Sequence, residues 1–174
     1  MKRQIRQSCF ETNSSSTHAI CIATEDILDI PKSIHFGFDD FGWSRNTYHD
    51  NTSKADYLYT ALPYVAQNMD ELQQYISFIY NTLKKHGVEE ITMEDFKLDV
   101  YYWDKDISLA ISSSGYIDHG SEISEFVNSV CSDENRLMHY LFSRRSYVET
   151  GNDNDDYDVD IKVDYPHEEF YKGN

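Results

Sequence analysis

Apolar residues recur at three- and four-residue intervals between positions 68 and 87, the spacing that places side chains on one face of a helix. The stretch "NMDELQQYISFIYNTLKKHG" is therefore predicted to be helical. Acidic residues occupy its first turn and basic residues its last, where each charge complements the helix dipole, and Gly87 supplies a C-terminal cap. The predicted apolar face consists of Leu72, Tyr75, Ile76, Ile79, Tyr80 and Leu83.

Strict alternation of apolar and polar residues marks a different element near the end of the chain. In "YDVDIKVDY" (157–165) every second residue is Tyr, Val or Ile, and the residues between them are three Asp and one Lys. This pattern predicts a half-buried antiparallel strand with an acidic outer face. Shorter strands are predicted in "SIHFGF" and in "KRQIRQSCFE" and "HAICIATE", the last two forming a hairpin with a loop over 12–17.

Further helices are indicated by capping residues. Ser53 is expected to cap a helix that ends at the boundary imposed by Pro63, Ser121 to open another, and Asp133 to cap a third over "DENRLMHYLF". Ile123, Phe126, Val127 and Val130 form the expected apolar side of the second. Segment 39–57 is predicted to be a long loop unless it packs against another part of the molecule. The stretches 89–103 and 106–117 are predicted to be either strands or strand-helix hybrids, because their periodicity does not distinguish the two.

These elements predict an α+β fold in which several helices pack on a mainly antiparallel sheet. With 174 residues, 40% of them apolar, the chain is long enough for one domain with a real core. The sequence shows no internal repeat and no linker, so residues 1–174 are expected to form a single domain.

Charge narrows the classes of function. Thirty-one Asp and Glu against 15 Lys and Arg give a net charge of −16 and a sequence pI near 4.6. Phosphate groups are bound by Lys and Arg, so direct binding to nucleic acid or to an anionic membrane is not expected. A partner with a positive surface would be attracted, and 14 Tyr and 9 Phe suit a binding surface. Solubility alone is the alternative explanation of the acidity.

Cysteine usage and hydropathy bear on the compartment. The chain has three cysteines, Cys9, Cys21 and Cys131. Because the number is odd and no two of them form a CxxC pair, neither a disulfide framework nor a zinc knuckle is indicated. No apolar run approaches the roughly 20 residues of a membrane span, and "MKRQIRQ" lacks the apolar block of a signal peptide. A cytoplasmic protein without a cofactor is expected.

The hydroxyl-rich stretch "TNSSSTH" (12–18) has three interpretations. Side-chain to backbone hydrogen bonds would make it a structural turn. Successive amides and hydroxyls could instead contact an anion or a partner through Ser14, Ser15, Ser16 and His18. Ser16 and His18 could also share one face of a strand as nucleophile and base.

Two other stretches carry candidate chemistry. "GYIDHG" contains Asp118 and His119, which with His18 and Asp153 could form the metal site of a hydrolase or phosphoesterase if the fold brings them together. The spacing matches no standard zinc motif, and a loop capping the next helix is the other interpretation.

The acidic run near the C-terminus begins in "GNDNDD". It lacks the glycine and the final glutamate of an EF-hand, so calcium binding is not indicated. Carboxylates two residues apart on a strand repeat every ~6.7 Å and could mimic nucleic-acid phosphates before a basic groove. An ordinary acidic surface that contacts only water would have the same sequence pattern. The residues predicted to bind a partner are Asp153, Asp155, Asp156, Asp158 and Asp160.

Four stretches together, "RQSCFETNSSSTH", "FGWSRNTYHDNTSKADYLYT", "GYIDHGSE" and "SYVETGNDND", resemble a group of small phage and mobile-element proteins of Firmicutes-type bacteria. Members of this group begin with a similar basic strand, E-T-N-S-S-S and a histidine. The resemblance spans most of the chain and implies a bacterial host cytoplasm, but no reaction.

Small acidic proteins encoded by the same kinds of phage and mobile element include anti-CRISPR proteins, which bind an RNA-guided effector nuclease. Context and charge together indicate an inhibitor that binds the basic nucleic-acid-binding surface of a host defence protein of this kind. The hydrolase described above and a non-catalytic structural or regulatory phage protein remain alternatives, and a homodimer is left open.

Overall fold

The computed structural model describes residues 16–24, 26–42, 45–103, 106–112, 114–118, 123–152 and 168–173. It has an α+β fold, as predicted, in which helices pack against a mainly antiparallel sheet. No helix in these ranges is long and apolar enough to cross a membrane.

The main sheet has four antiparallel strands in the order β10-β1-β9-β4. The strand predicted from "HAICIATE" corresponds to the inner strand β1, which ends at Ala23, and its residues from His18 to Ala23 are all buried. Ile20 and Ile22 of this strand join the hydrophobic core. The bounds of the strands are β1 Ser16–Ala23, β4 Asn46–Tyr48, β9 Tyr147–Asn152 and β10 Glu168–Gly173.

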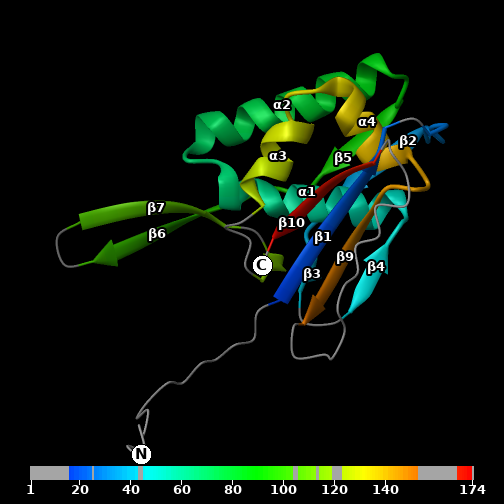
Figure 1. Ribbon diagram of the computed structural model, residues 1–174. Helices are drawn as coiled ribbons and strands as arrows, with labels where there is room; N and C mark the ends of the chain where they lie inside the picture. Colours follow the sequence, from blue (N-terminus) through cyan, green and yellow to red (C-terminus); the bar gives the residue numbers. More distant parts are fainter. Residues whose placement is uncertain are drawn as a thin grey trace, which may run out of the picture.

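Six further strands form three separate pairs. The pairs β2–β5 and β3–β8 are parallel, whereas β6 and β7 form an antiparallel hairpin that projects from the body of the molecule (Figure 1). Their bounds are β2 Ser33–Phe36, β3 Asp40–Phe41, β5 Glu90–Met93, β6 Lys97–Trp103, β7 Asp106–Ser112 and β8 Tyr116–Ile117.

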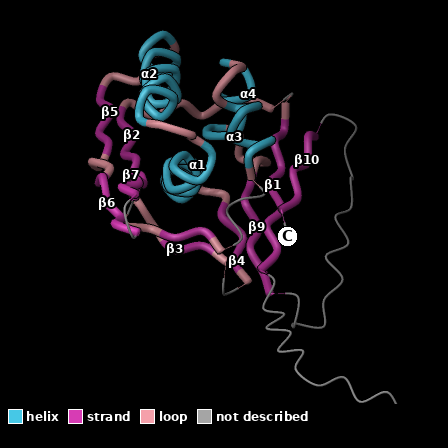
Figure 2. The backbone as a smooth tube through the Cα atoms, turned by 90° about the vertical axis from the view of Figure 1, so that its left-hand side faces the viewer, coloured by secondary structure: helices cyan, strands magenta, loops and turns pink. Residues whose placement is uncertain are grey.

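Helix α1 (Asn51–Val65) lies between the four-stranded sheet and the β2–β5 pair, so it is the central element of the fold (Figure 2). Its start and end differ from the prediction. Asp50, not Ser53, is the N-cap, and its carboxylate accepts a 2.8 Å hydrogen bond from the amide of Ser53. Pro63 lies inside the helix, which continues to Val65; a proline this close to the end interrupts only one helical hydrogen bond.

The other helices largely follow the sequence pattern. Helix α2 (Met69–Lys85) is confirmed, with Asn68 as N-cap and Gly87 at φ +93° after its last turn, although Tyr80 of the predicted apolar face is 42% exposed. Helix α3 (Ser124–Val130) begins later than predicted, after Ile123, and has no side-chain cap; the predicted Ser121 lies outside the described residues. Its four apolar residues are buried as predicted.

Helix α4 (Glu134–Phe142) is capped as predicted by Asp133, which accepts hydrogen bonds from the amides of Asn135 and Arg136. The long loop predicted over 39–57 is wrong, because β3, β4 and the start of α1 lie within it. Segments 89–103 and 106–117 contain strands, and no helix. The predicted first strand and hairpin loop fall largely outside the described residues, as does the alternating strand 157–165.

Lys54 is a fully buried cation in the centre of the fold. Its ammonium donates hydrogen bonds to the carbonyls of Ser143 (2.8 Å) and Ser146 (3.3 Å), just beyond the end of α4, where the helix dipole favours a cation. Burial lowers the pKa of Lys54 to about 8, partly opposed by the negative charges of Asp50 and Asp26. A neutral amine still has two hydrogens for the two carbonyls, so both protonation states satisfy them.

We therefore expect the titration of Lys54 to make the free energy of unfolding increase with pH. Between pH 8 and 10.5, unfolded Lys54 holds a proton that folded Lys54 has lost, so the free energy of unfolding increases with pH. From pH 7 to pH 8.5 the increase is about 1 kcal/mol. Urea unfolding of the wild type and of Lys54→Met isolates this increase, since the other titrating groups cancel in the difference. A difference that stays constant over this pH range contradicts the prediction.

Candidate functional site

The predicted partner-binding residues fall into two groups. The five C-terminal residues Asp153, Asp155, Asp156, Asp158 and Asp160 lie outside the described residues, as do Ser14 and Ser15. Ser16 is the first residue of β1, where it pairs with Asn152 of β9. His18 is completely buried in this structure, and its contact with an anion or a partner stays a prediction.

Both ring nitrogens of His18 are engaged inside the protein. Nε2 lies 2.7 Å from the backbone carbonyl oxygen of Asp118, which only accepts hydrogen bonds, so Nε2 carries the hydrogen. Nδ1 lies 3.3 Å from the hydroxyl of Tyr57, within hydrogen-bonding distance. Burial raises the pKa of Tyr57 far above its usual value and keeps this hydroxyl protonated. His18 therefore ties β1 to α1 and to the end of β8 through both of its ring nitrogens.

The hydrolase interpretation needed His18, Asp118, His119 and Asp153 to converge. The structure brings His18 to the backbone of Asp118, whereas the Asp118 carboxylate accepts a 2.9 Å hydrogen bond from Tyr116. Among the described residues, no group of three or more His, Cys, Asp or Glu side chains is placed to hold a metal ion; His119 and Asp153 lie outside them. Both nitrogens of His18 are engaged with the Tyr57 hydroxyl and the Asp118 carbonyl, and neither contact is with another candidate metal-ligating side chain.

The four stretches that carry the resemblance meet at His18. This residue ends the first stretch, Tyr57 belongs to the second and Asp118 to the third. Thr150, in the fourth, is the strand partner of His18 on β9. Phe41 strengthens the junction, because its carbonyl accepts from the amide of Asp118 and its ring packs edge-on against Tyr57. We call these residues the His18 junction: the described parts of the four stretches meet here although they are far apart in sequence.

A second feature, which the sequence reasoning missed, is an exposed group of carboxylates around Gly37. Asp56 of α1 accepts a 2.7 Å hydrogen bond from the Gly37 amide. A Cβ added at Gly37 would meet atoms of His35, Asp56 and Glu94 at 3.3–3.4 Å, so these three side chains surround it. The charges of Asp39 and Glu94 act on Asp56, and those of Glu94 and Asp95 act on the neighbouring Tyr59, so we call Asp39, Asp56, Glu94 and Asp95 the acidic cluster.

The pKa of Asp56 reflects the proximity of these negative charges. Partial burial raises the pKa of Asp56, and the charges of Asp39 and Glu94 raise it further, whereas the Gly37 hydrogen bond and His35 oppose the shift. The imidazole of His35 lies 3.9 Å from the Glu94 carboxylate. The ion pairs of Lys32, Arg45, Lys85 and Arg144 are made with other carboxylates. The charges of Asp39 and Glu94 act on Asp56, and those of Glu94 and Asp95 act on Tyr59, so negative charge is concentrated in the acidic cluster.

Three aromatic rings support the acidic cluster. Phe38, Tyr59 and Phe96 pack together with ring centroids 4.7–5.1 Å apart, and Phe38 and Phe96 are only partly buried. The Tyr59 hydroxyl donates a 2.7 Å hydrogen bond to the backbone carbonyl of Glu94. Partly exposed rings beside carboxylates favour a cation such as an arginine side chain, through cation–π attraction and charge.

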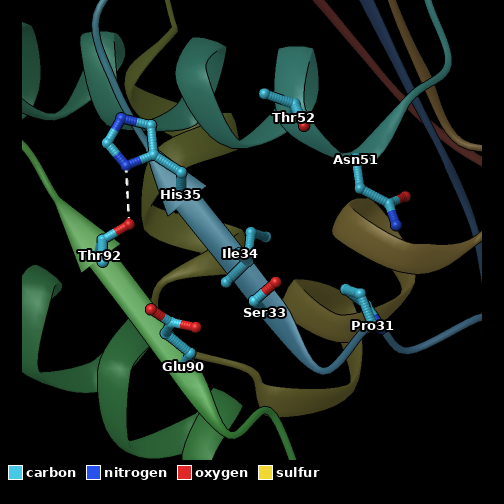
Figure 3. Close-up of a pocket in the computed structure, with 8 residues that line it drawn as sticks. All are labelled: Pro31, Ser33, Ile34, His35, Asn51, Thr52, Glu90 and Thr92. Atoms are coloured by element: carbon cyan, nitrogen blue, oxygen red, sulfur yellow. Dashed lines mark hydrogen bonds between the residues drawn. The ribbon is translucent and has the colours of Figure 1, made fainter.

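A polar pocket of about 430 Å³ adjoins this region on the outer face of β2 and β5. Figure 3 shows the imidazole of His35 hydrogen-bonded to Thr92 on the neighbouring strand, with a distance of 2.8 Å between Nδ1 and Oγ1. Asn51 and Thr52, at the start of α1, line the other side of β2. Glu90 of β5 contributes a carboxylate to the lining, and His35 is shared between the pocket and the surroundings of Gly37.

A sequence signal for the acidic cluster existed in "FDDF" and "MEDF", which each combine two acids with phenylalanine. Nothing in the chain order indicated that β2 and β5 pair and bring the two stretches together. Searches against family models, curated proteins and solved structures found no match. The function is therefore argued from these surfaces and from the sequence.

Proposed function

We propose that this protein is a phage-derived acidic inhibitor that binds the positively charged nucleic-acid-binding surface of a host defence nuclease, an RNA-guided effector of the CRISPR type. The observation that carries the proposal is the acidic cluster on its aromatic support. It matches in charge a groove that holds the phosphates of DNA. The resemblance to phage and mobile-element proteins supplies the host context.

The charges suit recognition of arginine and lysine. Glu94 and Asp95 are exposed and adjacent to Phe96, so a guanidinium can meet carboxylates and a ring at the same place. The net charge of −16 adds long-range attraction to a basic surface and speeds association. Salt screens exposed charges over about 8 Å at physiological ionic strength, so binding should weaken as salt rises.

The C-terminal aspartates extend the same proposal. Asp153, Asp155, Asp156, Asp158 and Asp160 follow directly after β9, within a segment that contains nine acids and one base between residues 149 and 169. We expect their joint replacement by asparagine to slow association with the nuclease by about 10-fold at low salt. The measurement is stopped-flow binding at two salt concentrations. An association rate that is unchanged at low salt would remove these residues from the interface.

Direct binding tests the proposal itself. The purified protein is immobilised and exposed to a purified, guide-loaded effector nuclease at low and at physiological salt, with an acidic protein of similar size and charge as the control surface. Retention on this protein but not on the control supports the inhibitor. Equal retention on both surfaces shows that charge alone is responsible, and absence of retention at low salt contradicts the proposal.

A further inference from the structure

Strand β2 has one edge that no other described strand covers, because β2 pairs with β5 alone. In a parallel ladder, alternate residues of a strand direct their backbone groups to the partner strand. On β2, the carbonyls of Lys32 and Phe36 accept hydrogen bonds from the amides of Glu90 and Glu94, at the two ends of the pairing. The even-numbered residues of β2 therefore direct their backbone groups to β5.

The odd-numbered residues Ser33 and His35 consequently direct their N–H and C=O groups to the other edge. None of these four backbone groups has a hydrogen-bond partner in the part of the chain that the structure describes. Gly37 is next in the same row, and its amide donates to Asp56, which ends the row. We call the backbone groups of Ser33 and His35 the β2 edge. Uncovered strand edges of this kind pair readily with another extended chain.

The polar pocket lies along the β2 edge. Figure 3 shows β2 with β5 on one side and Asn51 and Thr52, at the start of α1, on the other. The consecutive residues Ser33, Ile34 and His35 all line the pocket. Neighbouring strand residues point to opposite faces, so a pocket that reaches all three includes the edge of the strand. Its volume of about 430 Å³ is within the roughly 300–1,000 Å³ of ligand-binding sites.

Charge and side-chain size identify the occupant. Glu90 lines the pocket and lies directly opposite Ser33 in the β2–β5 register, and both residues are exposed. Glu90 forms no ion pair within the described residues, whereas the neighbouring Glu89 pairs with Lys32. Ser33 is small, so a long side chain from a strand added at the β2 edge can cross it and reach the Glu90 carboxylate. Lysine and arginine combine the required length with a positive charge.

We propose that the β2 edge binds an extended peptide segment of another protein, with a lysine or arginine of that segment placed over Ser33 and against Glu90. Backbone hydrogen bonds to Ser33 and His35 supply affinity that is independent of the peptide sequence, and the pocket selects the basic side chain. This inference goes beyond the inhibitor proposal. It uses neither the C-terminal aspartates nor Glu94 and Asp95, so each of the two proposals can fail without the other.

Amide hydrogen exchange, followed by nuclear magnetic resonance on the isotope-labelled full chain, tests the inference. The probe is the acetylated and amidated hexapeptide Thr-Arg-Val-Arg-Val-Thr at millimolar concentration. The control peptide has the same side chains but is methylated at every backbone nitrogen, which blocks strand pairing. We expect the amides of Ser33 and His35 to exchange freely without peptide and at least about 10-fold more slowly with the probe. The Ile34 amide, which faces β5, should be protected in both cases.

Two variants test the charge. Glu90→Gln should weaken binding of the probe about 3- to 5-fold in a chemical-shift titration. Glu125→Gln makes the same change at an exposed position in the first turn of α3 and should leave binding unchanged. Both positions are exposed, and circular dichroism checks that both variants remain folded.

Slowed exchange at Ser33 and His35 with the probe alone, together with weaker binding by Glu90→Gln alone, supports the inference. Slow exchange of these two amides in the free protein overturns it, because the β2 edge would already be covered. Exchange that the probe leaves unchanged, equal effects of the two peptides, or equal weakening by the two variants also overturns it.

Discussion

Reversing the charge of Glu94 and Asp95 is expected to weaken binding to a guide-loaded effector nuclease by about 100-fold or more at physiological salt. Both side chains are exposed and follow β5, next to Phe96 of the aromatic support. Glu94→Lys with Asp95→Lys removes two attractive charges and places two cations against a basic groove. Juxtaposed like charges cost several kcal/mol, so the effect exceeds that of simple neutralisation.

A matched control separates this local effect from a change in net charge. Asp70→Lys with Glu125→Lys also changes the net charge by +4, and both residues are exposed, in the first turns of α2 and α3. The control pair should weaken binding only a few-fold, through the long-range field. Titration calorimetry with the purified nuclease measures both variants. Equal weakening by the two pairs would show that the acidic cluster has no special role.

Replacing His18 with alanine is expected to lower the free energy of unfolding by about 3–5 kcal/mol. The substitution removes a fully buried ring, leaves a cavity, and deprives the Asp118 carbonyl and the Tyr57 hydroxyl of their partner. Because the His18 junction joins β1, α1 and the end of β8, the loss affects several elements at once. Urea unfolding followed by far-ultraviolet circular dichroism measures it.

Tyr57→Phe is a milder substitution that tests the same hydrogen bond. It keeps the ring that packs against Phe41 and removes only the hydroxyl, so it should cost about 1 kcal/mol. A cost of His18→Ala below that of Tyr57→Phe would contradict the account of the His18 junction. Unchanged binding of the nuclease by the still-folded Tyr57→Phe variant is also expected, since the hydroxyl is buried.

The sequence predicted those parts of the fold that local patterns determine. Helix α2 has a clear apolar face and caps at both ends, and Asp133 caps α4 as its position before an apolar run suggested. The predictions failed where contacts between distant segments determine the secondary structure. The boundary expected at Pro63 did not hold, and β3 and β4 are strands of two and three residues that form only because distant partners lie beside them.

The candidate surfaces were harder to predict for the same reason. His18 was recognised as a notable residue, but its burial depends on Tyr57 and Asp118, which are 39 and 100 residues away in the chain. The acidic cluster depends on α1 and on the pairing of β2 with β5, which bring three separate segments to Gly37. Neither arrangement leaves a periodic signal in the sequence.

Competition with DNA shows whether this protein occupies the nucleic-acid-binding surface of the nuclease. A labelled target duplex is bound to a purified, guide-loaded effector nuclease, and fluorescence anisotropy is followed as this protein is added at physiological salt. The account predicts that the wild type displaces the duplex, whereas the Glu94→Lys, Asp95→Lys double variant does not. A duplex that stays bound and is cleaved at the normal rate in the presence of excess wild-type protein would contradict the account.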